Sequence, residues 1–341
     1  MGNKIKNKNY NVVLFGGSNS VLKNGLQQGL KQDNVNLFNF SLGMTTCIQN
    51  LYELKRSKNF DCILKADLII SESNINDYAA VVNPKESLSL EILYRNLDLF
   101  YYELSIMKDK KILILILPMF KHISEIVNKI HLKLIFQYKL NYIDMSYFFN
   151  KYDFKDFYQS YDMQHPLPVI MENLGQNIIH NIELLHITSH IQIEREYSLN
   201  IYEMSDKTNS IQNSMYSENP FVLSNNKMYF PKKFYGYKFL SLHTWNYLPD
   251  IGLKNSTLCY SDILIQNKEK YILKSCNFLN SCVEIQDSDF VIDKNTYFLC
   301  ENKRTDYTEY YHGAKNWLSN SKKYNSLNLI SFFLIKYDKN M

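Results

Sequence analysis

The chain has 341 residues, of which 45% are hydrophobic and 21% are charged, and its formal net charge is +4 at pH 7. This length is more than one average core covers, so we expect two domains. No stretch approaches the ~20 uninterrupted apolar residues of a membrane span, and the lysines form no basic stripe, so we expect neither a membrane span nor a nucleic-acid partner.

The N-terminal segment MGNKIKNKNYNVVLFGG is basic and passes directly into a short apolar run. It lacks the longer apolar region and the small-residue cleavage site of a secretion signal. Lys6 stands where a myristoylation motif requires Ser or Thr. We therefore expect an unlipidated protein with a cytoplasmic location.

The first half of the chain alternates short apolar runs with segments of helical periodicity. The apolar runs predict five strands, at residues 11–15, 36–40, 66–71, 111–117 and 142–145. The helical spacing predicts helices at residues 21–30, 88–107, 123–136 and 167–190. Strands that alternate with helices indicate an α/β domain, here over residues 1–193, with a parallel five-stranded sheet flanked by helices.

The second half of the chain has a different pattern. Residues 194–218 are polar and aperiodic, which indicates a linker. Over residues 219–341, β-rich runs separated by turn residues predict a sandwich-like accessory domain of roughly eight strands. The expected strands are residues 227–230, 237–242, 258–265, 271–273, 282–285, 290–292, 296–300 and 327–337.

The six cysteines contain no CxxC pair, which argues against a structural zinc site and against a thioredoxin-like redox motif. Free thiols are expected in a reducing compartment, although Cys276 and Cys282 are close enough in sequence to meet across a hairpin. The acidic residues also lack metal-like spacing. We therefore expect no metal and no cofactor.

A serine follows two glycines directly after the first expected strand, in the segment VVLFGGSNS. The glycines permit a sharp turn, and the start of a helix provides free backbone N–H groups beside the hydroxyl of Ser18. This pattern is typical of a nucleophilic serine. It is also typical of a helix N-cap or a phosphate-binding turn, so Ser18 alone does not decide between these roles.

Two further segments follow the second and third expected strands. Gly43 lies in NFSLGMTT, where a backbone N–H without a neighbouring side chain has access to a bound carbonyl oxygen. Asn76 lies in LIISESNINDY, where a side-chain amide at the carboxyl edge of a parallel sheet can donate to an oxyanion. A turn glycine and a loop-capping asparagine are the simpler interpretations of these two residues.

The segment DMQHP, just before the last expected helix, contains an aspartate and a histidine separated by two residues. This spacing lets the carboxylate of Asp162 bind one imidazole nitrogen of His165 while the other nitrogen faces a serine. A helix-capping aspartate beside a surface histidine is the alternative.

Together these segments resemble the four sequence blocks of the SGNH (GDSL-like) hydrolase family, over about residues 10–185. The resemblance implies a flavodoxin-like fold and a triad in which Ser18 is the nucleophile, His165 the base and Asp162 its orienting group. It also implies an oxyanion hole formed by the backbone N–H groups of Ser18 and Gly43 and by the Asn76 side chain.

The sequence departs from the family pattern at two positions. Gly17 replaces the usual Asp before the nucleophile, and Asn74 replaces the usual Gly of the third block. We interpret both as subfamily variation. Asn74, Asp77 and Glu72 lie close to Asn76 in the sequence, and we consider them candidate substrate-binding residues.

We therefore expect a serine esterase that removes a small acyl group, an acetyl group in our hypothesis, from a carbohydrate or another small ester. An O-acetyltransferase that uses an acyl donor and a sugar hydroxyl, and an inactive glycan-binding protein on the same fold, are the alternatives. In the second domain, several aromatic rings are candidates for a glycan platform that stacks on sugars, and packing in the core is the equally good alternative. The aromatic residues are Trp245, Tyr247, Tyr310, Tyr311 and Trp317.

Overall fold

The computed structural model describes residues 8–82, 87–118, 124–154, 156, 158–159, 162–188, 195–204, 210–246, 259–277, 279–309 and 322–337. The chain divides into two compact units. The first consists of Met1–Ala79 and Leu93–Ile193, and the second consists of Ala80–Ile92 and Glu194–Met341. Each unit has its own β-sheets and its own buried core.

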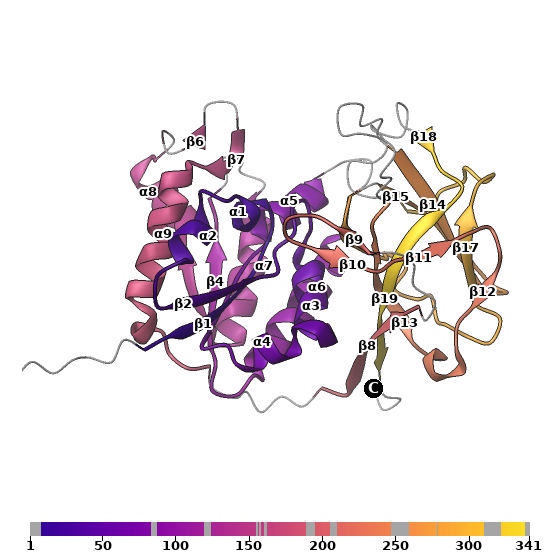
Figure 1. Ribbon diagram of the computed structural model, residues 1–341, viewed down its shortest axis with the longest axis horizontal. Coiled ribbons are helices and arrows are strands. Elements are labelled where there is room, and N and C mark those ends of the chain that lie inside the picture. The colour runs from indigo at the N-terminus through magenta and orange to yellow at the C-terminus, as the bar shows by residue number, and fades with distance from the viewer. Residues whose placement is uncertain are drawn as a thin grey trace, which may run out of the picture. The chain divides into compact units, whose positions relative to one another are not determined.

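The first unit is built on a parallel sheet of five strands in the order β2-β1-β3-β4-β5 (Figure 1). The strands are β1 (Tyr10–Phe15), β2 (Val35–Asn39), β3 (Leu68–Glu72), β4 (Lys111–Ile116) and β5 (Asn141–Asp144). The central strands are apolar along nearly their whole length because a parallel sheet is covered on both faces. The expected parallel five-stranded sheet is confirmed.

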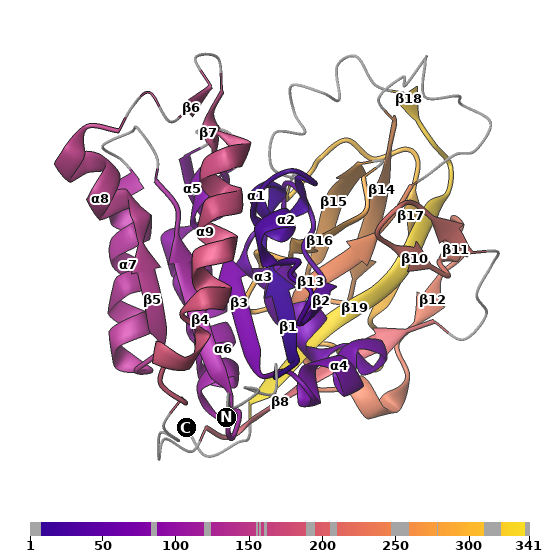
Figure 2. The same cartoon turned by 60° about the vertical axis from the view of Figure 1, so that its left-hand side comes forward.

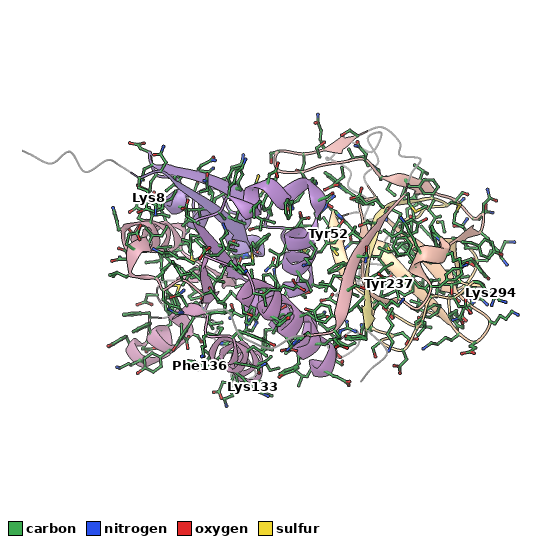
Figure 3. All side chains as sticks on the ribbon, turned by 90° about the horizontal axis from the view of Figure 1, so that it is seen from below. Lys8, Tyr52, Lys133, Phe136, Tyr237 and Lys294 are labelled. Carbon is green, nitrogen blue, oxygen red and sulfur yellow. The ribbon has the colours of Figure 1, made fainter. Side chains whose placement is uncertain are left out.

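Helices cover both faces of this sheet (Figures 1 and 2). Helices α2 (Leu26–Leu30) and α9 (Pro168–His180) lie on one face. Helices α3 (Cys47–Lys55), α6 (Leu90–Ser105) and α7 (Ser124–Gln137) lie on the other. Phe136 on α7, labelled in Figure 3, is largely exposed, and its ring lies 5.4 Å, centroid to centroid, from that of Tyr142 on the edge strand β5. Such an open sheet leaves the carboxyl ends of its strands free for a site.

Several helices differ from the sequence-based expectation. The helix expected at 21–30 is divided into α1 (Ser18–Val21) and α2, because the backbone at Leu22 is extended, with ψ 122°. The helix expected at 167–190 ends at His180 and is followed by a 3-10 turn, Ile182–Leu184. Four of the described helices were not expected from the sequence: α3, α4 (Phe60–Leu64), α5 (Asn74–Val82) and α8 (Met145–Tyr152).

The second unit contains two five-stranded sheets. The first has β11 (Phe221–Leu223), β19 (Leu327–Tyr337), β13 (Lys238–Thr244) and β16 (Ser281–Glu284) in that order, with β8 (Tyr197–Glu203) also paired to β19. The second has β12 (Met228–Tyr229), β17 (Tyr297–Glu301), β14 (Cys259–Gln266) and β15 (Tyr271–Asn277), with β18 (Lys322–Lys323) also paired to β14. A short hairpin of β9 (Ile211–Gln212) and β10 (Ser217–Glu218) is separate from both.

Aromatic side chains from both sheets form the core of the second unit. The ring of Phe332 on β19 lies 4.9 Å, centroid to centroid, from the ring of Phe298 on β17. Phe230 contacts both rings, at 4.9 and 5.1 Å. Because the two sheets share this core, the expected β-rich, sandwich-like region is confirmed.

Two expectations for the second unit are corrected. The segment 194–218 is not simply a linker, because β8 pairs with β19 over seven residues, from Tyr197 opposite Tyr337 to Glu203 opposite Ser331. The polar residues within β8 hid this strand in the sequence. The strand expected at 290–292 forms only an isolated bridge, between Val291 and Lys238.

The structure also shows the state of the cysteines and the position of one aromatic residue expected in the glycan platform. The cysteines whose side chains the structure describes are free thiols, so Cys276 and Cys282 do not form a disulfide; the free cysteines are Cys47, Cys62, Cys276, Cys282 and Cys300.

The Trp245 side chain is only 5% exposed, which argues against its role in a sugar-stacking platform. Tyr247, Tyr310, Tyr311 and Trp317 lie outside the described residues. Among the helices described, none is long and apolar enough to cross a membrane.

Candidate active site

Ser18 is the first residue of α1, directly after the Gly16-Gly17 turn that ends β1. Ser18 is half-buried, whereas Gly17 and Asn19 on either side of it are buried. Within the described ranges, no hydrogen-bond acceptor meets the backbone N–H of Ser18. The turn therefore presents a partly accessible hydroxyl and an unpaired N–H at the carboxyl edge of the sheet.

His165 connects this hydroxyl to a carboxylate. Its Nε2 lies 2.7 Å from Ser18 Oγ, and its Nδ1 lies 2.6 Å from Asp162 Oδ2. The side chains of His165 and Asp162 are 22% and 30% exposed, so substrate can reach the site. In this arrangement Nδ1–H donates to Asp162, and Nε2 accepts the proton of Ser18, which is the geometry of a serine nucleophile with its base.

A short hairpin holds His165 and Asp162 in place. It consists of β6 (Tyr158–Gln159) and β7 (Asp162–Pro166). The Tyr158 hydroxyl donates to the carbonyl of Pro118, just beyond the end of β4. On the other side, Asn19 Nδ2 donates to the carbonyl of Gln164 at 3.2 Å. The hairpin is thus fixed both to the sheet and to Asn19, the residue after Ser18.

The local environment keeps Asp162 ionised. Burial by itself raises the pKa of this carboxyl, but the backbone N–H of Gln164, at 3.0 Å, and the contact with His165 outweigh it. The net effect is a pKa of Asp162 below its ordinary value. A carboxylate is therefore available to orient the imidazole and to stabilise it when it becomes protonated.

The two other candidate oxyanion residues lie on segments that contact the serine turn. The Leu42 N–H donates to the carbonyl of Gly16 at 2.9 Å, and the Asn76 side chain packs on Gly17. Asn76 Nδ2 also donates to the carbonyl of Thr45, at 2.9 Å. Asn76 is half-buried on α5 and retains a second amide hydrogen. The N–H of Gly43 has no acceptor in the parts of the chain that the structure describes.

Glu72, Asn74 and Asp77 do not fit the substrate-binding role that we expected. Their side chains are 2%, 0% and 0% exposed. Asn74 bonds both backbone groups of Leu117, at 2.8 and 3.0 Å. This expectation is therefore corrected, because these side chains are buried and face the protein interior.

Sequence reasoning also missed a buried network behind Asn76. Asp77 accepts the Cys47 N–H at 2.9 Å and the Ser73 hydroxyl at 2.7 Å, and it lies 3.0 Å from His131 Nε2. His131 Nδ1 lies 2.7 Å from the Tyr101 hydroxyl. Apart from Ser73, which is four residues from Asp77, these partners come from α3, α6 and α7, so no local sequence signal could have grouped them.

The described residues include no group of three or more His, Cys, Asp or Glu side chains arranged to hold a metal ion. What the site offers chemically is a serine hydroxyl, an imidazole, a carboxylate and unpaired N–H donors. This combination is suited to acyl transfer.

No protein-family model matches the sequence, and no curated protein sequence matches it either. Solved structures do match. A two-domain esterase (CEX) active on acetylated mannans, crystallised with mannopentaose, aligns over 98% of this chain and 92% of its own, with a TM-score of 0.54 and 9% identity. The chain has the fold of this two-domain esterase.

Two further matches extend over about half of the chain. The lipase/acylhydrolase from Enterococcus faecalis covers 51% of this chain and 96% of its own, with a TM-score of 0.42 and 18% identity. Axe2, an acetylxylan esterase from Geobacillus stearothermophilus, covers 51% and 94%, with a TM-score of 0.42 and 14% identity. The alignment with the two-domain esterase, in contrast, includes the β-rich unit as well as the parallel sheet.

Proposed function

We propose that the protein is a serine esterase that removes an acetyl group from a carbohydrate through an acyl-enzyme on Ser18. One observation carries the proposal: the continuous hydrogen-bond chain from Asp162 through His165 to Ser18, with distances of 2.6 and 2.7 Å. An inactive glycan-binding protein would have no need for this arrangement. The triad residues named from the sequence are the catalytic residues of the proposal.

The first half-reaction forms the acyl-enzyme. His165 Nε2 takes the hydroxyl proton while Ser18 Oγ attacks the acetyl carbonyl carbon, and Asp162 stabilises the imidazolium that results. The N–H groups of Ser18 and Gly43 and the side chain of Asn76 donate to the developing oxyanion. When the tetrahedral intermediate collapses, the sugar oxygen leaves and takes the proton from His165.

The second half-reaction releases the acetyl group. Water attacks the acyl carbon, and His165 takes one of its protons. Collapse of the second intermediate returns that proton to Ser18 Oγ and releases acetate. The Asp162 carboxylate is only partly buried, and its pKa lies below the ordinary value. It therefore stays ionised throughout the cycle.

The carbohydrate substrate in this proposal is supported by the fold comparison. The esterase that aligns over nearly the whole chain acts on acetylated mannans and was crystallised with mannopentaose. We infer an acetylated oligosaccharide or polysaccharide as the substrate class, and we infer that the β-rich unit is an accessory domain to the catalytic one.

The proposal is tested by comparing the wild type with Ser18→Ala on 4-nitrophenyl acetate and on acetylated mannan and xylan oligosaccharides. We expect release of acetate by the wild type only, and a loss of at least ~10⁴-fold in the variant. A serine-directed phosphonate should add one equivalent of label to the wild type and none to Ser18→Ala. Equal behaviour of the two proteins in both assays would refute the triad.

The same acyl-enzyme would act as an O-acetyltransferase if a sugar hydroxyl, and not water, received the acetyl group. Incubation with an acetyl donor and unacetylated oligosaccharides separates the two reactions. We expect free acetate and no acetylated oligosaccharide. Acetylated product in preference to acetate would replace the hydrolase by the transferase.

A further inference from the structure

Glu72 is a buried carboxylate beneath the turn that carries Ser18. It is the last residue of β3, which pairs in parallel with β1, so that Phe15 lies opposite Ser71. The Glu72 side chain is only 2% exposed. Glutamate is rarely buried to this extent unless it has partners that require it. Substrate cannot touch this carboxylate, so any effect on the reaction acts through the turn.

One oxygen of Glu72 binds both sides of the nucleophile. Its Oε1 accepts the backbone N–H of Gly17 at 2.8 Å and the hydroxyl of Ser20 at 2.9 Å. Gly17 is the residue before Ser18, and Ser20 is two residues after it. The carboxylate therefore spans the short segment Gly17–Ser20, in which Ser18 provides the hydroxyl and the free N–H of the site.

The glycine at position 16 is explained by the same contact. A Cβ atom at Gly16 would lie 2.6 Å from Glu72 Oε1 and 2.4 Å from Ser20 Oγ. Real Cβ atoms do not approach other atoms so closely, and both neighbours are buried. The carboxylate and the hydroxyl occupy the space that a side chain at position 16 would need, so Gly16, Ser20 and Glu72 form one fitted unit.

We propose that Glu72 is the positioning residue of the nucleophile turn, which it fixes so that Ser18 Oγ stays within hydrogen-bond reach of His165. This inference rests on the proposed function for its catalytic consequence. The structural part, that removal of the carboxylate moves Ser18 away from His165, stands independently of any reaction. Burial alone makes the carboxylate of Glu72 unfavourable for the folded state, because it raises the pKa of the carboxyl above the ordinary value.

The test compares Glu72→Gln with Glu72→Met in the full-length protein. The glutamine keeps an oxygen that can accept from Gly17 and Ser20, whereas methionine has a similar length and leaves the Gly17 N–H unpaired. We expect kcat of Glu72→Gln within about fivefold of the wild type. We expect a loss of about 100-fold in kcat for Glu72→Met, because a displacement of ~1 Å at a reacting group has an effect of this size.

Two further readouts separate positioning from general stability. KM for 4-nitrophenyl acetate should change by less than about threefold in Glu72→Met, and the rate of phosphonate labelling at Ser18 should fall in parallel with kcat. The matched control is Glu103→Met, which removes another buried carboxylate of the same unit, paired to Lys55 at 2.7 Å. It should lower the melting temperature without changing kcat or the labelling rate.

A folded Glu72→Met that retains the wild-type kcat and labelling rate would overturn the inference. If Glu72→Met does not fold, Ser20→Ala takes its place, since it removes one of the two donors to the carboxylate and should lower kcat about tenfold with KM unchanged. Unchanged kcat in Ser20→Ala would then refute the positioning role.

Failure of the proposed function is distinguishable from failure of this inference. A wild type that hydrolyses no acetyl ester and takes up no phosphonate label would refute the esterase. In that case crystal structures of the wild type and of the folded variant decide. The separation of Ser18 Oγ and His165 Nε2 should increase beyond about 3.5 Å in the variant, and an unchanged separation overturns the positioning role.

Discussion

Gly17 packs so closely on Asn76 that a Cβ atom at position 17 would lie 2.0 Å from the Asn76 side-chain nitrogen and 3.0 Å from its Cγ. The residue before Ser18, the proposed nucleophile, thus touches the side-chain amide that we propose as an oxyanion donor. The same amide donates to the carbonyl of Thr45. Any side chain at position 17 must displace the amide, so the absence of the Asp that is usual in the SGNH family fits this local geometry.

Gly17→Ala should therefore lower kcat by about 10- to 100-fold, because the Asn76 donor is pushed from its place while the triad remains. Kinetics on an acetyl ester provide the measurement, and a double-mutant cycle with Asn76→Ala provides the control. In the double variant there is no side-chain amide for the methyl group at position 17 to displace. Its kcat should therefore equal that of Asn76→Ala alone. Additive losses would show that Gly17 acts by another route.

The sequence was sufficient to predict the parallel sheet, the sandwich-like second unit and three side chains, those of Ser18, Asp162 and His165, that the structure brings within hydrogen-bond distance of one another. These features depend on continuous apolar runs and on short motifs at strand ends, which are local. The role of Glu72 was not predictable, since its partners Gly17 and Ser20 are about 50 residues away and a buried glutamate has no sequence signature. The helix over 21–30 was predicted as one piece because Gly25 and Gly29 fit an apolar stripe. The structure shows that Gly29 serves the packing of α2 on α9.

Asp162→Asn should reduce kcat by about 10³- to 10⁴-fold at neutral pH, with little change in KM. The amide can present its N–H to Nδ1, which favours the wrong tautomer of His165 and removes the charge that stabilises the imidazolium. Because the pKa of Asp162 lies below its ordinary value, the carboxylate should stay ionised on mild acidification. Rate measurements on the wild type and on Asp162→Asn from pH 5 to 8 test whether Asp162 orients His165 as a carboxylate. A variant with more than a tenth of the wild-type rate would remove Asp162 from the triad.

Glu72 should make the stability of the protein depend on pH in a defined direction. Burial, and to a lesser degree the charge of Asp77, raise the pKa of Glu72 in the folded state above its ordinary value of 4.5. As the pH increases from about 4, the unfolded carboxyl ionises first, so the folded state loses stability relative to the unfolded state until the folded pKa is passed. Below both pKa values this loss is absent.

The difference in urea midpoint between the wild type and Glu72→Gln isolates this effect, since all other titrating groups are common to both proteins. The wild type should lose stability relative to the variant between pH 4 and pH 8. A difference that stays constant, or that changes in favour of the wild type as the pH rises, would contradict the raised pKa.

The contact between α2 and α9 predicts a substitution that affects stability and not chemistry. A Cβ atom at Gly175 would lie 2.7 Å from the Leu26 carbonyl oxygen and 2.8 Å from backbone atoms of Gly29 and Leu30. Backbone atoms cannot turn aside as a flexible side chain can, so Gly175→Ala must push the two helices apart, at a cost of about 2 kcal/mol.

Gly25→Ala is the matched control, because its Cβ would meet Met171 at an ordinary 3.5 Å, and we expect a change in stability below ~1 kcal/mol. Urea denaturation measures both variants, and kcat at a temperature well below unfolding should equal that of the wild type in each. Because α9 begins two residues after Pro166, at the end of the strand that carries His165, a fall in kcat for Gly175→Ala would show that the helix contact also sets the position of the base.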